Sequence, residues 1–263
     1  MSNSIKISIS VVFYNSQFDD VNRTFKNFTK LCSLKEYDFQ FFAIDNGSQN
    51  NCFEYIKKLS KDFENVTSIK LNENNGFGSG HNSVLNDLNS SYHIVMNPDI
   101  IIEDVTGFKM AIDYLQQHSN VVLLSPLVKN MDGSIQYLNR HKHTLFDLLI
   151  RFIGPNFFKK RQDWFVKKEN GYGSIQQDEN ATGCFMLLRT NVFKSIGGFD
   201  TRYFLYFEDA DLTYRLEQEG KTIFFPMLNV KHEWQRKNHT LQGIKYELIS
   251  LYLFFSKWGW KLY

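Results

Sequence analysis

The sequence predicts an α/β fold whose mostly parallel central sheet is covered by helices on both faces. Two observations support this fold class. Over the first 120 residues, short apolar segments with strand periodicity alternate with segments of helical periodicity. Strands joined through helices pair in parallel and are buried on both faces. With 263 residues, 43% of them hydrophobic, the chain can also bury a full core.

The expected elements of the first half follow in order. Residues 5–13 alternate between apolar and polar side chains, which is typical of a strand. Apolar residues from Val21 to Leu31 recur at helical spacing, after acidic residues that favour a helix start. The same two patterns predict further strands at 39–44, 66–71 and 93–96, and further helices at 53–60, from the glycine-rich loop to about 88, and at 108–115.

The pattern changes after residue 120. Two short apolar segments, 121–128 and 134–138, flank a Met131-Asp132-Gly133 turn and predict a hairpin. Residues 145–170 are first amphipathic, then basic, then loop-like. The expected core is completed by the segment 182–189, a helix from Glu208 and a strand at 222–227.

Composition excludes several classes of protein. A net charge of only +2 argues against nucleic-acid binding as the main role, so we expect no nucleic-acid partner. The cysteines are odd in number, far apart and without a CxxC pair, which indicates reduced thiols in a cytoplasmic protein. The N-terminus has a strand pattern rather than that of a signal peptide, and no apolar stretch reaches the ~18 residues that span a bilayer.

Carboxylates follow two of the predicted strands, where α/β proteins bind their ligands. Asp45 lies at a strand–loop–helix corner and suits a hydrogen bond to a base or ribose; the alternative is an Asn46-Gly47 hairpin turn. Asp99 ends the sequence Asn97-Pro98-Asp99, which alone signals a turn. At a strand end it is also a hard oxygen ligand for Mg²⁺ or Mn²⁺, which completes its shell from substrate phosphates and water.

A third acidic cluster, Glu208-Asp209-Ala210-Asp211, begins a predicted helix. Asp211 and Arg215 stand at i,i+4, so their simplest role is a structural ion pair. Asp209 has no helical counter-charge, which makes it the better candidate for chemistry. Stabilisation of the helix N-terminus explains Glu208 equally well.

A glycine-rich segment precedes the fourth predicted strand. It does not fit the dinucleotide fingerprint GxGxxG, because His81 stands where the last glycine is required. Gly76, Gly78 and Gly80 still permit close backbone approach, which suits a loop that contacts a nucleotide; the alternative is a flexible turn. After the last strand, His232 is followed by Arg236 and Lys237, a group suited to phosphate oxygens.

With these residues in place, the chain resembles an inverting glycosyltransferase of family two, which has a GT-A fold. It is most similar to bacterial rhamnosyltransferases that build surface polysaccharides. The resemblance runs from about Ile5 to Trp234. The motifs that carry it are Val11-Val12-Phe13-Tyr14-Asn15, Asp45-Asn46-Gly47-Ser48, Asn75-Gly76-Phe77-Gly78, Asn97-Pro98-Asp99, Gly197-Gly198-Phe199-Asp200 and Phe207-Glu208-Asp209-Ala210-Asp211-Leu212.

The resemblance implies roles for individual residues. Asp209 matches the general base, Asp99 the metal-binding end of the family's DxD motif, and His232 a position near the metal and diphosphate. Asn97 stands where many members have Asp; this departure favours a deoxythymidine-diphosphate rhamnose (dTDP-rhamnose) donor and makes the first ligand neutral. The remaining donor-binding residues would be Asn15, Asp45, Gly76, Gly78, Arg236 and Lys237. The acceptor would be a glycan or a lipid-linked sugar.

On this interpretation one GT-A domain covers residues 1–239. Residues from about 1 to 100 would bind the nucleotide sugar, residues 101–239 would bind the acceptor, and 240–263 would form a C-terminal helix. Three alternatives stay open: an inactive nucleotide-sugar-binding protein, a nucleotidyltransferase and a glycoside hydrolase. A nucleotidyltransferase should carry a basic glycine-rich loop after its first strand, and a hydrolase needs neither the glycine loop nor Asp45.

The C-terminal segment predicts an amphipathic helix. Its apolar residues recur at steps of three and four, which places them on one face: Leu241, Ile244, Leu248, Leu251, Phe255, Trp258 and Leu262. Lysines beside this face suit a membrane interface, and a second contact is expected from Leu145 to Ile153 with Lys159-Lys160-Arg161. We therefore expect peripheral association with the inner face of the cell membrane; packing on the core or a homodimer contact is the alternative.

Overall fold

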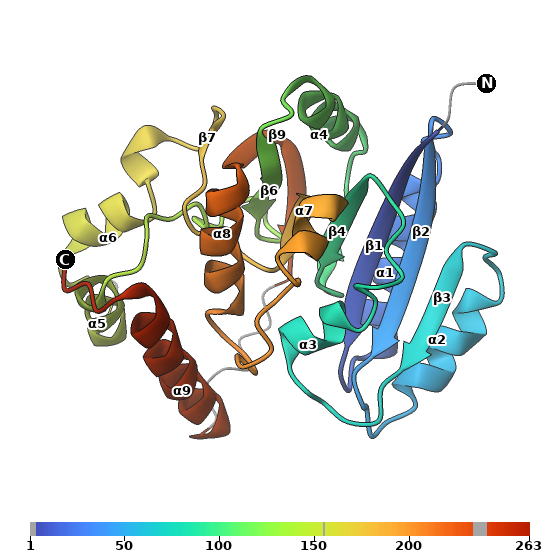
Figure 1. Ribbon diagram of the computed structural model, residues 1–263, viewed down its shortest axis with the longest axis horizontal. Coiled ribbons are helices and arrows are strands. Elements are labelled where there is room, and N and C mark those ends of the chain that lie inside the picture. Colours follow the sequence, from blue (N-terminus) through green and yellow to red (C-terminus); the bar gives the residue numbers. More distant parts are fainter. Residues whose placement is uncertain (1–3, 155, 234–240) are drawn as a thin grey trace.

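The computed structural model describes residues 4–154, 156–233 and 241–263. Its centre is one sheet with the strand order β3-β2-β1-β4-β8-β6-β9-β5 (Figure 1). The first half of the sheet is parallel throughout, as predicted. Its strands are β1 (Ile5–Phe13), β2 (Tyr37–Asp45), β3 (Val66–Lys70) and β4 (Tyr92–Met96).

The second half of the sheet is mixed. Its strands are β5 (Ile100–Ile101), β6 (Val121–Lys129), β7 (Gln176–Gln177), β8 (Phe185–Arg189) and β9 (Lys221–His232). β8 pairs antiparallel with both β4 and β6, while β6 and β9 are parallel. The short strands β5 and β7 each pair antiparallel with β9. The predicted mostly parallel arrangement therefore holds throughout the first half and for the β6–β9 pair, whereas β8 and the short strands β5 and β7 run in the opposite direction.

Helices cover both faces of the sheet, and alternate side chains of one strand enter two separate cores. One core contains Phe41 of β2 together with α1 (Phe18–Leu31), α2 (Cys52–Ser60) and α4 (Thr106–Gln117). The other contains Phe42 of the same strand with residues of α3 (Phe77–Asn82), α7 (Thr190–Ser195) and α8 (Glu208–Glu219). This period-two alternation is the pattern expected for a strand buried on both sides.

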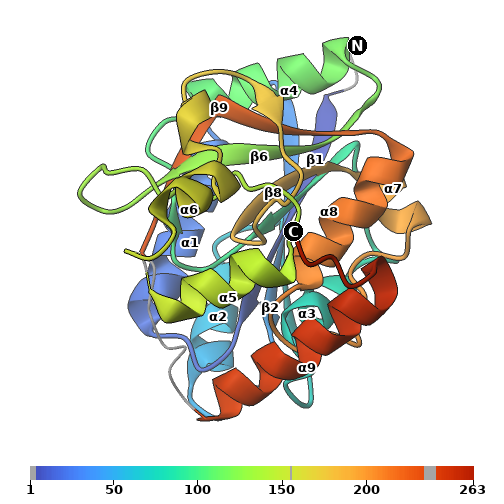
Figure 2. The ribbon, with the colours of Figure 1, turned by 90° about the vertical axis from the view of Figure 1, so that its left-hand side faces the viewer.

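A third cluster lies beyond the sheet. α5 (Leu145–Ile153) and α9 (Leu241–Trp258) lie side by side there, with α6 (Lys159–Phe165) next to α5 (Figure 2). The short 3₁₀ helix η1 (Lys168–Asn170) contacts α6. Phe254 and Phe255 of α9 are buried against aromatic residues at the start of α8. The backbone N–H of Leu145 donates to the carbonyl of Lys261 at 2.9 Å, which joins α5 to the segment after α9.

Several predicted elements differ from the structure. The hairpin after β6 is reduced to one bridge between Lys129 and Ile135. The helix of the glycine-rich segment ends at Asn82 rather than near 88. β9 continues to His232, beyond the predicted end at 227. α9 ends at Trp258 because Gly259 adopts a left-handed backbone (φ 92°), so the predicted helix at 240–263 is shorter.

Candidate active site

The parallel strands bring the predicted site residues to one edge of the sheet. Phe13, the last residue of β1, lies opposite Asp45, the last residue of β2. Met96, the last residue of β4, pairs with Val11 of β1, so Asn97 follows at the same edge. The backbone N–H of Asn97 donates to the carbonyl of Cys184 at 2.9 Å, which ties this corner to the start of β8.

Asp45 and Asn15 hold the loop that follows β2. The buried Asp45 carboxylate accepts from the N–H of Ser48 through Oδ2 at 3.2 Å, and its Oδ1 has no hydrogen-bond partner among the described residues. Asn15 adopts a left-handed backbone (φ 49°); its N–H donates to Ser48 Oγ at 2.8 Å and its Oδ1 accepts from the N–H of Gln49 at 2.9 Å. This loop is therefore a strand–loop–helix corner, and the hairpin alternative at Asn46-Gly47 is wrong.

A pocket of about 370 Å³ opens beside this loop. It lies at the ends of β1, β2 and β3, and its lining includes Tyr14, Gly47, Ser48, Lys70 and Glu73. Its volume is in the range of small-ligand sites. A larger groove, of about 620 Å³, lies between α1 and β5 and contains none of the predicted site residues.

The glycines of the predicted nucleotide loop are packed tightly inside the protein. A Cβ atom on Gly76 would lie 2.2 Å from the carbonyl oxygen of Phe204, and one on Gly78 would lie 2.6 Å from Cβ of Phe199. Gly76 also has a φ of 93°, a conformation that other residues rarely adopt. Packing therefore accounts for both glycines, whereas a flexible turn does not; a contact with the donor stays a prediction.

Asp99 and His232 meet through the pairing of β5 with β9, in which Ile100 lies opposite His232. Nε2 of His232 is 3.2 Å from Oδ1 of Asp99. The contact lacks hydrogen-bond geometry, so this buried carboxylate oxygen has no hydrogen-bond partner in the described part of the chain. On its other side, His232 Nδ1 lies 3.4 Å from Oε1 of Gln136, whose Nε2 donates to the His232 carbonyl at 2.9 Å.

These two residues fit a divalent cation. Asp99 offers a buried carboxylate oxygen that accepts no hydrogen bond from the described residues. His232 offers an imidazole nitrogen beside it. Within the described ranges no cluster of three or more His, Cys, Asp or Glu could hold a metal by itself. A site of this kind would take its other ligands from substrate phosphates and water, as Mg²⁺ sites commonly do.

Asp209 lies at the first turn of α8. Its Oδ2 accepts from the N–H of Gly183 at 3.0 Å and its Oδ1 from the N–H of Ala210 at 2.8 Å. Burial raises the pKa of Asp209, while these two N–H groups and the positive charge of Arg140 act in the opposite direction. The carboxylate is therefore held by backbone amides and carries no ion pair among the described residues, as its spacing in the sequence suggested.

Asp209 and the Asn97 corner are both attached to the segment Gly183-Cys184: the N–H of Gly183 donates to Asp209, and the carbonyl of Cys184 accepts from the N–H of Asn97. Burial raises the pKa of the Cys184 thiol to about 12, and the charges of both Asp99 and Asp209 contribute. Glu208, next to Asp209, is buried as well, and its Oε2 has no hydrogen-bond partner within the part of the chain described. Burial and the neighbouring Asp209 raise the pKa of Glu208 to about 8, so helix stabilisation does not account for it.

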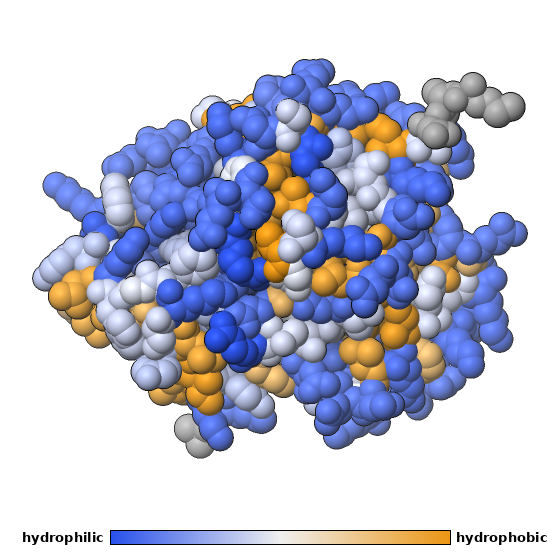
Figure 3. All heavy atoms as spheres, viewed as in Figure 1, coloured by the Kyte–Doolittle hydropathy of each residue, from blue (hydrophilic) through white to orange (hydrophobic). Residues whose placement is uncertain are grey.

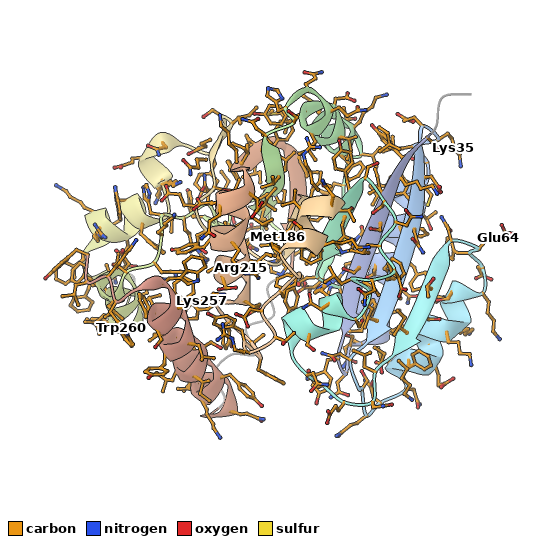
Figure 4. The ribbon with its side chains drawn as sticks, viewed as in Figure 1. Lys35, Glu64, Met186, Arg215, Lys257 and Trp260 are labelled. Atoms are coloured by element: carbon orange, nitrogen blue, oxygen red, sulfur yellow. The ribbon has the colours of Figure 1, made fainter. Side chains whose placement is uncertain are left out.

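The Asp211–Arg215 ion pair is confirmed, with Nε of Arg215 at 2.8 Å from Oδ2 of Asp211. Asp211 also accepts from Nζ of Lys257 at 2.6 Å and from Nε1 of Trp258 at 2.9 Å. The labelled Arg215 and Lys257 mark where α8 and α9 meet (Figure 4). Asp211 is therefore a structural residue that fixes α9 to α8.

Sequence patterns did not reveal two residues of this site. Gln136 lies in the predicted hairpin and contacts His232, and Arg140 lies in the loop that follows and acts on Asp209. Neither has a spacing or motif that could have identified it from the sequence. Two predicted donor-binding residues, Arg236 and Lys237, lie outside the described residues.

Comparisons with known proteins agree with this geometry. A model of glycosyl transferase family 2 matches residues 8–197. An N-acetylglucosaminyl-diphospho-decaprenol L-rhamnosyltransferase of Mycobacterium tuberculosis is 27% identical over 203 residues, which are 72% of this chain and 64% of the relative. The rhamnosyltransferase WbbL of Escherichia coli is 26% identical over 197 residues, which are 69% of this chain and 71% of WbbL.

A solved structure shows the same fold. The mannosyltransferase PcManGT from Pyrobaculum calidifontis, in complex with GDP-Man and Mn²⁺, matches with a TM-score of 0.65 at 12% identity, over 90% of this chain and 59% of that one. The predicted GT-A fold is thereby confirmed. The family model covers well over half of the chain. The chain therefore belongs to glycosyl transferase family 2.

Proposed function

We propose that the protein is an inverting glycosyltransferase in which Asp209 is the general base. The observation that carries this proposal is the placement of the Asp209 carboxylate. It is half-buried and held by two backbone N–H groups, one of them from Gly183, whose neighbour Cys184 binds the N–H of Asn97 two residues before Asp99. Base and diphosphate site would thus face one another across the reacting sugar.

An inverting transfer requires a base for the acceptor hydroxyl and positive charge for the leaving diphosphate. The acceptor hydroxyl must lose a proton to Asp209 as it attacks the anomeric carbon, and the bond to the diphosphate breaks on the opposite face of the sugar. The negative charge that develops on the diphosphate requires compensation. Asp99 and His232 would hold a divalent cation, Mn²⁺ or Mg²⁺, which would supply positive charge to that leaving group.

We propose dTDP-rhamnose as the donor. Two relatives are named rhamnosyltransferases, at 27% and 26% identity. Asn97-Pro98-Asp99 agrees with the same subgroup, with a neutral amide in place of the first carboxylate. The pocket beside Asp45 would receive the base and ribose, because it lies where α/β proteins bind nucleotides.

We propose a lipid-linked sugar as the acceptor. The name of the mycobacterial relative describes an acceptor of this class, a sugar joined through a diphosphate to decaprenol. Because the chain spans 64% of the length of that relative, the activity of the whole relative does not transfer automatically. The surface formed by α5 and α9 supplies an independent observation in favour of a lipid.

Part of the predicted apolar face of α9 is exposed. Phe255 is buried, whereas Leu248 of the same predicted face is 56% exposed. The predicted apolar face is therefore divided: the C-terminal half of α9 packs against α8, as the core-packing alternative expected, and the rest is exposed. Four large hydrophobic residues among those described in α9 are exposed: Ile244, Leu248, Ile249 and Tyr252. Figure 3 shows hydrophobic patches among hydrophilic residues in this region, at the lower left.

We propose that this exposed surface docks on an anionic membrane. Leu149 and Ile153 of α5, and Trp260 and Leu262 after α9, extend the apolar residues of α9. Exposed lysines border them at 159, 160, 245 and 261, which supplies positive charge for anionic lipid headgroups. No helix of the described residues is long and apolar enough to cross a membrane.

A panel of nucleotide sugars tests the proposed activity. We expect release of dTDP from dTDP-rhamnose, increased by Mn²⁺ and by a lipid-linked acceptor. Transfer from a UDP-hexose but not from dTDP-rhamnose would contradict the donor. Binding without turnover would favour an inactive nucleotide-sugar-binding protein, and release of pyrophosphate from a nucleoside triphosphate would favour a nucleotidyltransferase.

Flotation with vesicles tests the membrane proposal. We expect the protein to float with vesicles of anionic lipid, and Leu248→Ser with Tyr252→Ser to reduce this fraction. Met110→Ser is the matched control, because Met110 is 45% exposed on α4, away from α9. The surface is instead a homodimer contact if the wild-type protein does not float and Leu248→Ser with Tyr252→Ser lowers the molar mass in solution from that of a dimer to that of a monomer.

A further inference from the structure

Two arginines near the proposed base form no direct ion pair with a described carboxylate. Arg140 lies in the loop before α5, and Arg151 lies in the last turn of α5. Within the described ranges, neither is within ion-pair distance of an acidic group, and the buried Nε of Arg140 lacks a hydrogen-bond partner. Arg161, on the neighbouring helix, is by contrast neutralised by Asp147 at 2.6 Å.

The two guanidinium groups lie close enough to repel each other. The charge of Arg140 is the main cause that lowers the pKa of Arg151, to about 10. Both charges also act on His143, and together with burial they lower its pKa to about 3. Glu247 of α9 and Asp147 act on Arg151 in the opposite direction, so carboxylates beyond ion-pair distance compensate part of the charge of this exposed arginine.

His143 adds a hydrogen-bond donor to this group. The Nδ2 amide of Asn180 lies 2.7 Å from His143 Nε2 and can only donate, so Nε2 accepts and the neutral ring carries its proton on Nδ1. His143 is 9% exposed, and its Nδ1 has no partner in the described part of the chain. His143 and the Arg151 guanidinium both pack against Phe165, at 5.6 and 5.7 Å from its ring centroid, and Arg140 lies three residues before His143. N–H and guanidinium groups of this kind form the donor set that recognises phosphate.

The position of this group relates it to the acceptor. The rings of His143 and Phe207 are 5.3 Å apart, and Phe207 directly precedes Glu208 and Asp209, so the group lies beside the proposed base. Arg140 also acts electrostatically on Asp209. Arg151 lies on α5 between the exposed apolar residues Leu149 and Ile153, and its guanidinium packs over the ring of Phe165 at 5.7 Å. The charged group is thus placed between the proposed membrane surface and Asp209.

We propose that Arg140, Arg151 and His143 bind a phosphate of the acceptor, namely the diphosphate that joins its sugar to a lipid chain. This inference rests on the proposed glycosyl transfer and deepens it. It would anchor the charged part of the acceptor next to Asp209 while the lipid chain leaves along α5. These three residues would then select an acceptor that carries a lipid diphosphate, and other residues would recognise the donor nucleotide.

A binding experiment without donor tests the proposal directly. Farnesyl diphosphate, farnesol, inorganic pyrophosphate and dTDP are titrated into the full chain by calorimetry. We expect binding of farnesyl diphosphate to weaken about tenfold or more in Arg151→Gln and Arg140→Gln, because each loses a hydrogen bond to a charged group. Arg140→Lys should retain part of the affinity, and binding of dTDP should not change.

Arg202→Gln is the matched control. Arg202 is exposed, and its partner Asp200 stays paired with Lys257 at 3.0 Å when Arg202 is lost. Equal affinity of wild type and both Gln variants for farnesyl diphosphate would overturn the proposal. So would loss of dTDP affinity in the variants, because the arginines would then serve the donor diphosphate. Pyrophosphate binding as tight as that of farnesyl diphosphate would exclude a lipid-specific site.

Kinetics separate this proposal from the proposed function. With a diphosphate-linked acceptor we expect Arg151→Gln to raise KM and leave kcat nearly unchanged. With a neutral alkyl glycoside of the same sugar, the variant should behave as wild type. If wild type transfers no sugar from any donor, the proposed function fails, and the calorimetric result still decides whether the arginines bind the lipid diphosphate.

Discussion

Nε2 of His232 lies 3.2 Å from Oδ1 of Asp99, and the pairing of β5 with β9 brings the two residues together. Asp99 follows β4, whereas His232 is the last residue of β9. Gln136 fixes the imidazole from the other side. A carboxylate and an imidazole that are far apart in the sequence thus form one corner of the candidate site.

The first prediction concerns this corner. Asp99→Asn and His232→Gln should each weaken the stimulation of turnover by Mn²⁺, because each removes a ligand that a divalent cation would use. Titration of Mn²⁺ against dTDP release measures this effect. Glu103→Gln is the control, since Glu103 pairs with Lys231 next to His232. Full activity of wild type in excess chelator would show that no metal is needed.

The second prediction concerns Asp209. Asp209→Asn should reduce turnover about 10²-fold or more, because the amide cannot accept the acceptor proton. The affinity for dTDP should be unchanged, as measured by calorimetry. Asp163→Asn is a suitable control, because Asp163 is exposed and pairs only loosely with Lys168, at 3.4 Å. Near-normal transfer by Asp209→Asn would require another base.

The third prediction concerns Glu208, whose pKa is raised to about 8. Near pH 7, Glu208 should hold a proton and Asp209 should be ionised, since the N–H groups of Gly183 and Ala210 and the charge of Arg140 favour the charged form of Asp209. Glu208→Gln should therefore keep turnover at pH 7. The profile of kcat against pH should lose an inflection near pH 8 that wild type shows. A large loss of activity at pH 7 would mean that the charge of Glu208 is required.

The same shift affects stability. The folded-state pKa of Glu208 lies above its value in the unfolded chain, so its contribution is most favourable at low pH and is lost as the pH rises through 8. Glu208→Gln should consequently be more stable than wild type above pH 8. Urea unfolding at pH 6 and pH 9 measures this difference.

The fourth prediction concerns His93, which is buried beneath the sheet between Ser8 and Ser10, at 2.7 and 2.9 Å. Burial lowers its pKa to about 3. The unfolded chain binds a proton near pH 6.5 and the folded chain does not, so the free energy of unfolding should fall as the pH decreases below 6.5. The expected slope is up to about 1.4 kcal/mol per pH unit for this histidine.

Urea unfolding at pH 7.5 and pH 5.0 tests this prediction with His93→Gln. The variant should lose less stability than wild type between these two values, whatever its stability at pH 7.5. An unchanged difference would show that His93 is not the responsible group. His81, whose pKa burial lowers well below its usual value, should behave in the same way.

Local patterns in the sequence determined much of this protein. Period-two alternation predicted β1, and helical spacing predicted α1, because burial repeats at fixed intervals within one element. Strand ends placed Asp45 and Asn97 at one edge, since parallel strands end on the same side of a sheet. The i,i+4 spacing separated Asp211, a structural residue, from Asp209.

Only the tertiary structure decided the remaining features. The contact of His232 with Asp99, the approach of Gln136 and Arg140, and the burial of Phe255 but not Leu248 all depend on distant segments. β8 runs antiparallel to both of its neighbours, which no local pattern indicates. Periodicity records which side of an element is buried, whereas the partner that buries it is chosen by long-range packing.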